Sequence, residues 1–210
     1  RALDIAKWGT DMTHDPTLIE SMIGILIQGI GYKKAMEHMD SLSPAEAKVA
    51  LERLESFPKP AAFADIVRHE EMMVANTYKD VFQMSNVRGF QEGPEALTTG
   101  MAGQAVYNAM LLWYTKRGLI ENYTGVMDEY ARLAAMPYRE ASAPYEALTK
   151  RIDSGQGMNF LTRIVVPNMV RARWAYEAKA ATQEIIRARL MLTLWKAEHG
   201  GKLPTSLSEL

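Results

Sequence analysis

The chain of 210 residues is 48% hydrophobic and 23% charged, so it carries enough apolar material for a compact core and is too apolar for disorder. Its formal net charge of -1 provides no overall field that would attract nucleic acid or an anionic membrane. The absence of cysteine excludes disulfides, thiolate catalysis, thiolate zinc sites and iron–sulfur clusters. Ala, Leu and Met are abundant and Val is scarce, which predicts an all-α protein.

The first part of the chain predicts two helices. A short helix over 3–12 is followed by Asp15-Pro16, an N-cap with proline at the first helical position. The next helix, over about 16–40, is apolar around most of its circumference, which predicts a central helix buried on most sides. Glycine lowers helix stability, so we expect neighbouring helices to approach closely at three positions in it: Gly24, Gly29 and Gly31.

Two further helices are expected before residue 85. Ser43-Pro44-Ala45-Glu46 is a capping box and opens a helix that forms an antiparallel hairpin with the central one. A helix over about 60–84 carries one stripe at helical spacing: Phe63, Val67, Glu70, Val74, Tyr78 and Val81. The glycine- and proline-containing stretch 85–99 is the candidate sub-domain boundary within a single helical domain over 1–210.

The second part of the chain contains the remaining predicted helices, which bring the total for the whole chain to seven to eight. Helices over 101–116 and 119–135 are expected to form a second hairpin around Gly118, and Pro144 is expected to open a short helix before a joint at 154–157. The last helix, over about 167–199, is the longest and is expected to pack across the bundle. Its predicted seam consists of Trp174, Ala178, Ala181, Ile185, Ala188, Leu192 and Trp195.

Charge is divided unevenly along the sequence. Residues 1–162 contain 16 basic and 21 acidic side chains, a net charge of -5, whereas residues 163–210 contain 8 and 4, a net charge of +4. This division predicts that the last helix docks on an acidic body. The alternative is a solvated basic face without a partner.

Glu70 is the candidate catalytic residue because it is the charged member of an apolar stripe. A buried carboxylate needs a partner or a raised pKa, so Glu70 serves either in an internal ion pair or hydrogen bond or as a catalytic acid or base. The adjacent residues His69, Glu70 and Glu71 are the candidate metal ligands. No pair of histidines has the spacing of a helical zinc site, and the sequence predicts no cofactor.

An apolar ligand pocket is another hypothesis, since methionine and aromatic residues concentrate in the middle of the chain. Such residues also serve as ordinary core filler. The candidate lining consists of Met72, Met73, Met84, Met101, Met110, Trp113, Tyr114 and Met127. If they line a pocket, the protein is a carrier of an apolar ligand or lipid.

Three segments resemble a family of uncharacterised bacterial helical proteins: Asp15–Ile19, Asp128–Tyr138 and the stretch from Arg187 to the C-terminus. The resemblance covers most of the chain. It implies a hydrophobic export or anchor segment before Arg1 and further chain beyond the Leu-Pro-x-Ser-Leu motif. It implies no activity for any residue.

The end of the last helix resembles a second family. His199-Gly200-Gly201 followed by Leu203-Pro204 is similar to the stem-to-head junction of the type II secretion pseudopilins. A glycine that ends a helix and a proline that prevents its resumption also produce this pattern without shared function.

These observations favour a non-enzymatic, envelope-associated scaffold or protein-interaction module. A hydrolase-type enzyme that uses Glu70 and a carrier of an apolar ligand are the alternatives. The expected partner is another protein or a second copy in a homodimer, and no nucleic acid. Contact with a membrane is expected only through a segment N-terminal to Arg1, which implies an extracytoplasmic or membrane-anchored location.

Overall fold

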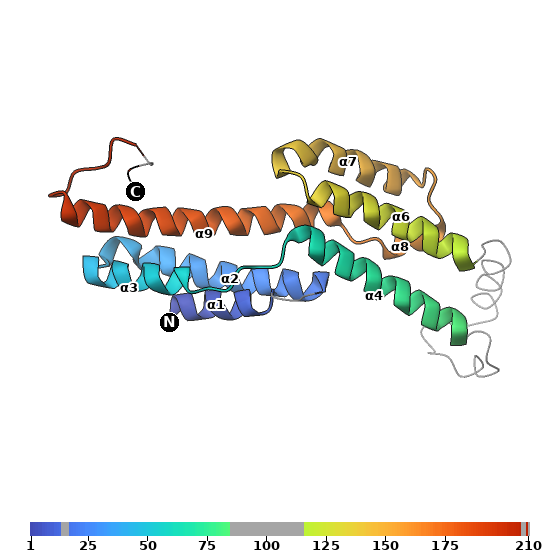
Figure 1. Ribbon diagram of the computed structural model, residues 1–210, viewed down its shortest axis with the longest axis horizontal. Coiled ribbons are helices and arrows are strands. Elements are labelled where there is room, and N and C mark those ends of the chain that lie inside the picture. Colours follow the sequence, from blue (N-terminus) through green and yellow to red (C-terminus); the bar gives the residue numbers. More distant parts are fainter. Residues whose placement is uncertain (14–16, 85–115, 207–208, 210) are drawn as a thin grey trace. The chain divides into compact units, whose positions relative to one another are not determined.

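The computed structural model describes residues 1–13, 17–84, 116–206 and 209 (Figure 1). Every secondary-structure element in these residues is a helix, which confirms the all-α class. Contacts divide the chain into two compact units, residues 1–66 with 171–210 (unit 1) and residues 67–170 (unit 2). The predicted single domain remains a prediction. The predicted boundary at 85–99 lies outside the described residues, as does nearly all of the predicted helix over 101–116.

Unit 1 is built from helices at both ends of the chain. The helices are α1 (Ala2–Asp11), α2 (Leu18–His38), the 3-10 turn η1 (Met39–Ser41), α3 (Pro44–Glu55), the first turn of α4 (Phe63–Met84) and most of α9 (Met169–Glu198). Figure 1 shows α9 running along the side of α2 and α3. The long C-terminal helix is therefore confirmed.

The helix starts follow from local capping. Ser43 and Glu46 form the predicted capping box at the start of α3. Helix α2 begins at Leu18, later than predicted, because Thr17 is its N-cap. The Thr17 nitrogen donates to the Glu20 carboxylate at 2.9 Å, and the Glu20 nitrogen donates to the Thr17 hydroxyl at 3.3 Å. The predicted cap, Asp15-Pro16, lies outside the described residues.

Glycines bring α1 and α2 into close antiparallel contact. A Cβ added to Gly24 would lie 2.6 Å from the Gly9 carbonyl oxygen, and one added to Gly31 would lie 2.5 Å from the Ala6 nitrogen. These distances are too short for any side chain, so the close approach predicted at Gly24 and Gly31 is confirmed. Gly29 differs, because a Cβ there meets no described atom within 4 Å.

The buried face of α9 is not the predicted seam. Trp174 and Ile185, which belong to that seam, are 61% and 55% exposed. The side chains that face the rest of unit 1 are buried or half-buried and alternate spacings of four and three: Ala172, Tyr176, Lys179, Gln183, Ile186 and Leu190. Half of the residues on this buried face are polar or amphipathic. The sequence prediction relied on apolar residues alone and therefore chose a neighbouring face of α9.

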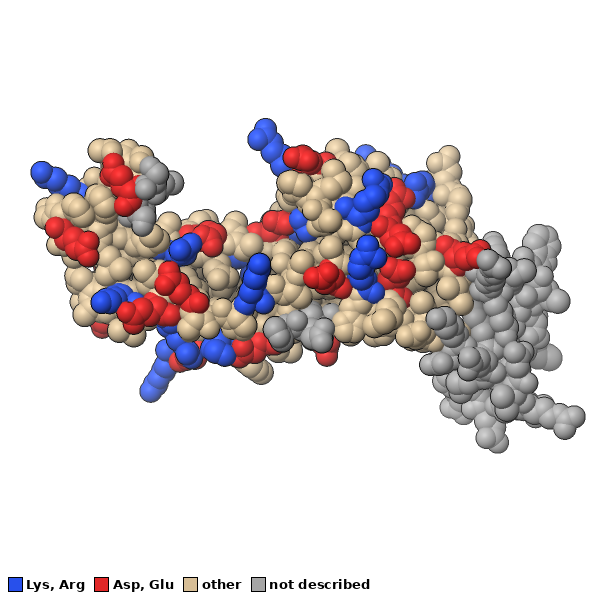
Figure 2. All heavy atoms as spheres, in the orientation of Figure 1, with Lys and Arg blue, Asp and Glu red and all other residues tan. Residues whose placement is uncertain are grey.

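Hydrogen bonds and ion pairs fix α9 in unit 1. The Tyr32 hydroxyl donates to the Gln183 side chain at 3.1 Å. Arg189 pairs with Asp40 of η1 at 2.6 Å and Arg187 with Glu55 of α3 at 3.7 Å, so the basic helix does pair with carboxylates of the N-terminal helices. On the face drawn in Figure 2, acidic and basic side chains intermingle over the described surface.

Unit 2 contains the rest of α4 with α6 (Lys116–Ala134), α7 (Tyr138–Ser154) and α8 (Phe160–Val165). Helices α6 and α7 form an antiparallel hairpin around two buried tyrosines. The rings of Tyr130 and Tyr145 stack with centroids 5.5 Å apart, and the Tyr145 hydroxyl donates to the Tyr130 carbonyl at 3.3 Å.

Several predicted boundaries in this region were wrong. Gly118 lies inside α6 rather than past the end of a helix, and Pro144 lies inside α7 rather than at its start. The stabilisation from burying Ala141, Tyr145 and other residues on one face of α7 is larger than the cost of the backbone hydrogen bond that Pro144 cannot donate. Gly155, with φ 73°, ends α7. Pro167 lies between α8 and α9 and so marks the start of the last helix.

The central helix α2 is buried on one side only. Its buried residues include Leu18, Gly24, Ile25, Gln28 and Tyr32. Four large aliphatic residues point away from the rest of unit 1 and are exposed: Ile19, Ile23, Leu26 and Ile30. The sequence predicts burial on most sides of this helix, but only the sides that face α1, α3 and α9 are buried. No described helix combines the length and the hydropathy that a membrane span requires.

Candidate functional site

Glu70 lies on the buried face of α4 in unit 2, as its place in the stripe predicts. Only 7% of its surface is exposed, and Val67 on the same stripe is fully buried. Burial, followed by the charge of Glu70, raises the pKa of the nearby Tyr123 hydroxyl above its ordinary value of 10.0. The ring of Tyr78 meets that of Tyr123 edge-on, with 5.8 Å between centroids. Glu70 therefore belongs to a buried layer with two tyrosines.

Burial also raises the pKa of Tyr78, so both tyrosines keep their hydroxyl protons at neutral pH. The Tyr123 hydroxyl is buried and makes no hydrogen bond in the described part of the chain. A catalytic carboxylate needs access to a substrate. The pocket of unit 1 described below has no residue of this layer in its lining.

The candidate metal ligands are consecutive on α4 and so point in different directions around the helix. Beside the buried Glu70, His69 and Glu71 are half-buried. Burial and the charge of Asp128 raise the pKa of Glu71, while Arg68 opposes them. Over the described ranges, no group of three His, Asp or Glu side chains is arranged to hold a metal ion.

The methionine-rich set does not form one lining in the described residues. Met127 is fully buried, whereas Met72 and Met73 are 55% and 38% exposed. The Met84 side chain and four members of the set lie outside the described residues: Met101, Met110, Trp113 and Tyr114.

An exposed apolar stripe on α2 is the most conspicuous surface feature of unit 1. Ile19, Ile23, Leu26 and Ile30, hereafter the α2 stripe, are 42–66% exposed. Their spacings of four, three and four place them in one line along the helix. Large exposed apolar patches on soluble proteins mark interaction sites, whereas single exposed apolar residues do not.

Helix α1 has two exposed apolar side chains of its own. Leu3 of α1 packs into the core with Ile186 of α9, so that face of α1 points toward α9. Ile5 and Trp8 lie on the opposite face of α1 and are 39% and 62% exposed. Helix α1 packs directly against α2, and Ile5 and Trp8 together with the α2 stripe are hereafter called the α1–α2 surface.

The ends of the α2 stripe carry opposite charges. Glu20 stands at its N-terminal end, and the exposed Lys33 and Lys34 stand at its C-terminal end. Lys34 pairs with Glu37 on the same helix at 2.8 Å. The surface is thus apolar along its length and polar at both ends.

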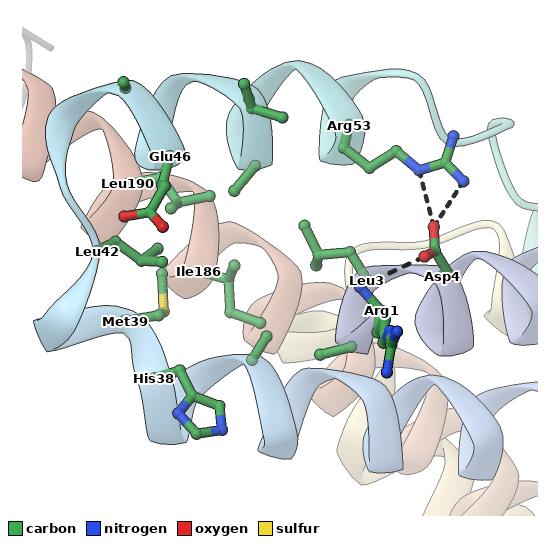
Figure 3. A pocket seen from close by; sticks show the side chains of 15 residues that line it. Arg1, Leu3, Asp4, His38, Met39, Leu42, Glu46, Arg53, Ile186 and Leu190 are labelled. Atoms are coloured by element: carbon green, nitrogen blue, oxygen red, sulfur yellow. Dashed lines mark hydrogen bonds and ion pairs between the residues drawn. The ribbon is translucent and has the colours of Figure 1, made fainter.

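A pocket of about 620 Å³ is the second feature of unit 1 (Figure 3). It is lined by the start of α1, the end of α2 and the turn after it, α3 and two residues of α9. In Figure 3 the aliphatic side chains of Leu3, Leu42, Ile186 and Leu190 face one another across the hollow. Such a volume and lining are typical of sites for apolar small molecules.

Charged side chains surround the mouth of this pocket. The Arg53 guanidinium donates to Asp4 at 2.8 and 3.2 Å and holds the pKa of that carboxyl below its ordinary value. The Glu46 carboxylate accepts from the Ser43 hydroxyl and nitrogen at 2.6 and 2.8 Å, which lowers the pKa of Glu46. Both carboxylates are therefore already engaged.

Neither feature of unit 1 was found from the sequence. The pocket is assembled from residues 1–4, 35–53 and 186–190, and no local pattern joins segments so far apart. The α2 stripe was visible as apolar periodicity, but a pattern cannot distinguish a face that packs inside the chain from one that stays exposed.

The comparisons with known proteins give no assignment. No protein-family model, no curated protein and no solved structure matches the chain. The resemblances to uncharacterised bacterial helical proteins and to the pseudopilin junction therefore remain predictions.

Proposed function

We propose that the protein is a non-enzymatic interaction module that pairs with a second copy of itself through the α1–α2 surface. The exposure of four large aliphatic side chains in one line on α2 carries this proposal. Water contact at such a line is unfavourable, and burial against a second apolar surface relieves it.

The α2 stripe is complementary to itself in an antiparallel arrangement. A two-fold axis halfway along the stripe places Ile19 of one copy opposite Ile30 of the other, and Ile23 opposite Leu26. All four positions are therefore filled by apolar partners, as a two-fold interface requires. A partner with unrelated spacing would leave some of them unpaired.

The end charges favour the same arrangement. An antiparallel copy sets the lysine end of each stripe against the Glu20 end of the other, whereas a parallel copy sets like charges side by side. Gly29, on the flank of the stripe, meets no described atom at its Cβ position. A glycine that lowers helix stability without an internal reason leaves room for a side chain of the partner.

The expected association is reversible. Full burial of a large aliphatic side chain contributes about 1.5–3 kcal/mol. The partly exposed members of the stripe retain roughly half of that, so two copies supply roughly 6–12 kcal/mol against an association cost of about 4–15 kcal/mol. Burial of Trp8 adds to the favourable side, and we expect a dimer whose population depends on concentration.

Sedimentation velocity over a range of protein concentrations tests the proposal. Leu26→Glu and Ile30→Glu should shift the chain to monomer, because each places a carboxylate in the apolar line. Ile164→Glu is the matched control, since Ile164 and Ile30 are both 63% exposed and Ile164 belongs to unit 2. Wild-type protein that remains monomeric throughout, or stripe variants that dimerise like the control, would contradict the proposal.

The envelope location is part of the same proposal and is supported by the family resemblance alone. Fractionation of cells that express the full-length protein tests it. The hydrolase-type alternative rests on Glu70, and no observation of the described residues favours it over the interaction module.

A further inference from the structure

We propose that the pocket of unit 1 binds a long-chain carboxylate, with the acyl chain across the aliphatic lining and the carboxylate at the end formed by Arg1 and Arg53. This inference is independent of the proposed dimer, because none of the residues of the α1–α2 surface lines the pocket.

The lining selects an acyl chain. An aliphatic wall is formed by residues from η1 and the position after it (Met39, Leu42), from α3 (Val49) and from α9 (Ile186, Leu190). No Phe, Tyr or Trp ring lines the pocket, so it offers no large aromatic surface to a planar ligand. The volume of about 620 Å³ lies inside the range of small-molecule sites.

The charges at the α1 end select an anionic head group. Two guanidinium groups, those of Arg1 and Arg53, line the pocket there beside one carboxylate, Asp4 (Figure 3). Arg53 is paired with Asp4, and within the described residues no carboxylate pairs with the Arg1 guanidinium. One positive charge is left over at this end, and guanidinium binds carboxylate in a two-pronged geometry.

The opposite end of the pocket has no second guanidinium that would bind a carboxylate of the ligand. Glu46 and His38 line it, and the Glu46 carboxylate is already held by Ser43. A ligand with one anionic end and one apolar end therefore fits the pocket in a single orientation. A neutral hydrocarbon would leave the Arg1 charge unused, and a cationic amphiphile would be repelled by it.

Isothermal titration with soluble amphiphiles tests the inference. Dodecanoate should bind, and octanoate, which is four methylenes shorter, should bind up to about 250-fold more weakly, because each buried methylene changes affinity by about fourfold. Dodecyltrimethylammonium, which has the same chain and the opposite charge, should bind at least about 10-fold more weakly than dodecanoate.

Two pairs of variants locate the binding. Ala45→Trp fills the pocket from α3 and should abolish binding, whereas Lys48→Trp, on the same helix outside the lining, should not. Arg1→Glu should weaken dodecanoate binding about 10-fold or more and leave the ammonium ligand unaffected or improved. Lys48→Glu makes the same change of charge outside the pocket and should have little effect.

Circular dichroism verifies that each variant is folded before titration. Equal binding of dodecanoate to Ala45→Trp and Lys48→Trp would overturn the site. Equal binding of the carboxylate and ammonium ligands would overturn the assigned head group, as would an unchanged affinity in Arg1→Glu. No binding of dodecanoate to the wild-type chain would overturn the whole inference.

Discussion

Replacing Gly31 with alanine tests the close packing of α1 on α2. The added Cβ would lie 2.5 Å from the Ala6 nitrogen and 2.8 Å from the Ala2 carbonyl oxygen. Both are backbone atoms that cannot rotate away, and carbon makes ordinary contact at roughly 3.5–4.0 Å. Helix α1 must therefore move by about 1 Å. Adding a methyl group to a packed contact costs about 1–3 kcal/mol, and the rigid backbone here places this cost at the upper end.

Gly29→Ala is the matched control on the same helix. Its Cβ meets no described atom within 4 Å, so it gains only the higher helix propensity of alanine, about 0.5–1 kcal/mol. Gly31→Ala has the same gain but loses packing, which leaves a net loss of about 2 kcal/mol. The two variants should differ by roughly 3 kcal/mol in the free energy of unfolding.

Urea denaturation, followed by helical circular dichroism at protein concentrations where the chain is monomeric, measures this difference. With a urea dependence of about 1–3 kcal/mol per molar, the two midpoints should differ by roughly 1 M or more. Gly29→Ala should have the higher midpoint. Coincident midpoints, or a higher midpoint for Gly31→Ala, would refute the close approach of the two helices.

The core and the buried lysine give further predictions. Ile186→Ala should lower the free energy of unfolding by about 2–5 kcal/mol through the cavity it leaves, and a loss near zero in urea denaturation would show that α9 is not packed there. Ser43→Ala should cost about 1 kcal/mol through loss of the α3 cap, with Ser41→Ala, outside the cap, as control. Burial lowers the pKa of Lys179 from its ordinary 10.5, so the unfolded chain binds more protons between the two pKa values and stability should rise with pH in that window. Lys179→Met should be more stable than the wild type at neutral pH, and its stability should not rise with pH in this window. Thermal melts up to about pH 9.5 measure this. Above that pH the buried tyrosines, including Tyr32 with its pKa raised to about 12, make stability fall as pH rises.

Local rules predicted the elements whose ends are determined by neighbouring residues. The capping box at Ser43 and Glu46 depends on four adjacent positions, and it was found where the sequence places it. The burial of Glu70 also follows from spacing along one helix. Pro144 was misplaced because its rule concerns the backbone alone, whereas the tertiary burial of Tyr145 keeps α7 helical on both sides of it.

The α9 seam and the pocket depend on what lies opposite. Lys179 and Gln183 are on the inner face of α9 because the interior of unit 1 there includes polar groups, such as the Tyr32 hydroxyl that bonds Gln183. A hydrophobic count cannot find such a face. The pocket requires Leu3 to face Leu190, and only the folded chain brings these two residues together.

The placement of α9 also has a consequence for the synthesis of the chain. Ala6, Tyr32, Met39, Ala47 and Leu54 complete their apolar cluster only with Ile186 and Leu190. A ribosome adds about 5–20 residues per second, so the 131 residues between Leu54 and Ile186 keep the first three helices waiting for roughly 7–26 seconds. Through that interval the nascent chain presents an unsealed apolar groove to the cell. A ribosome that stalls before α9 emerges would hold the chain in this state, in which it is a ready substrate for chaperones that bind exposed apolar segments.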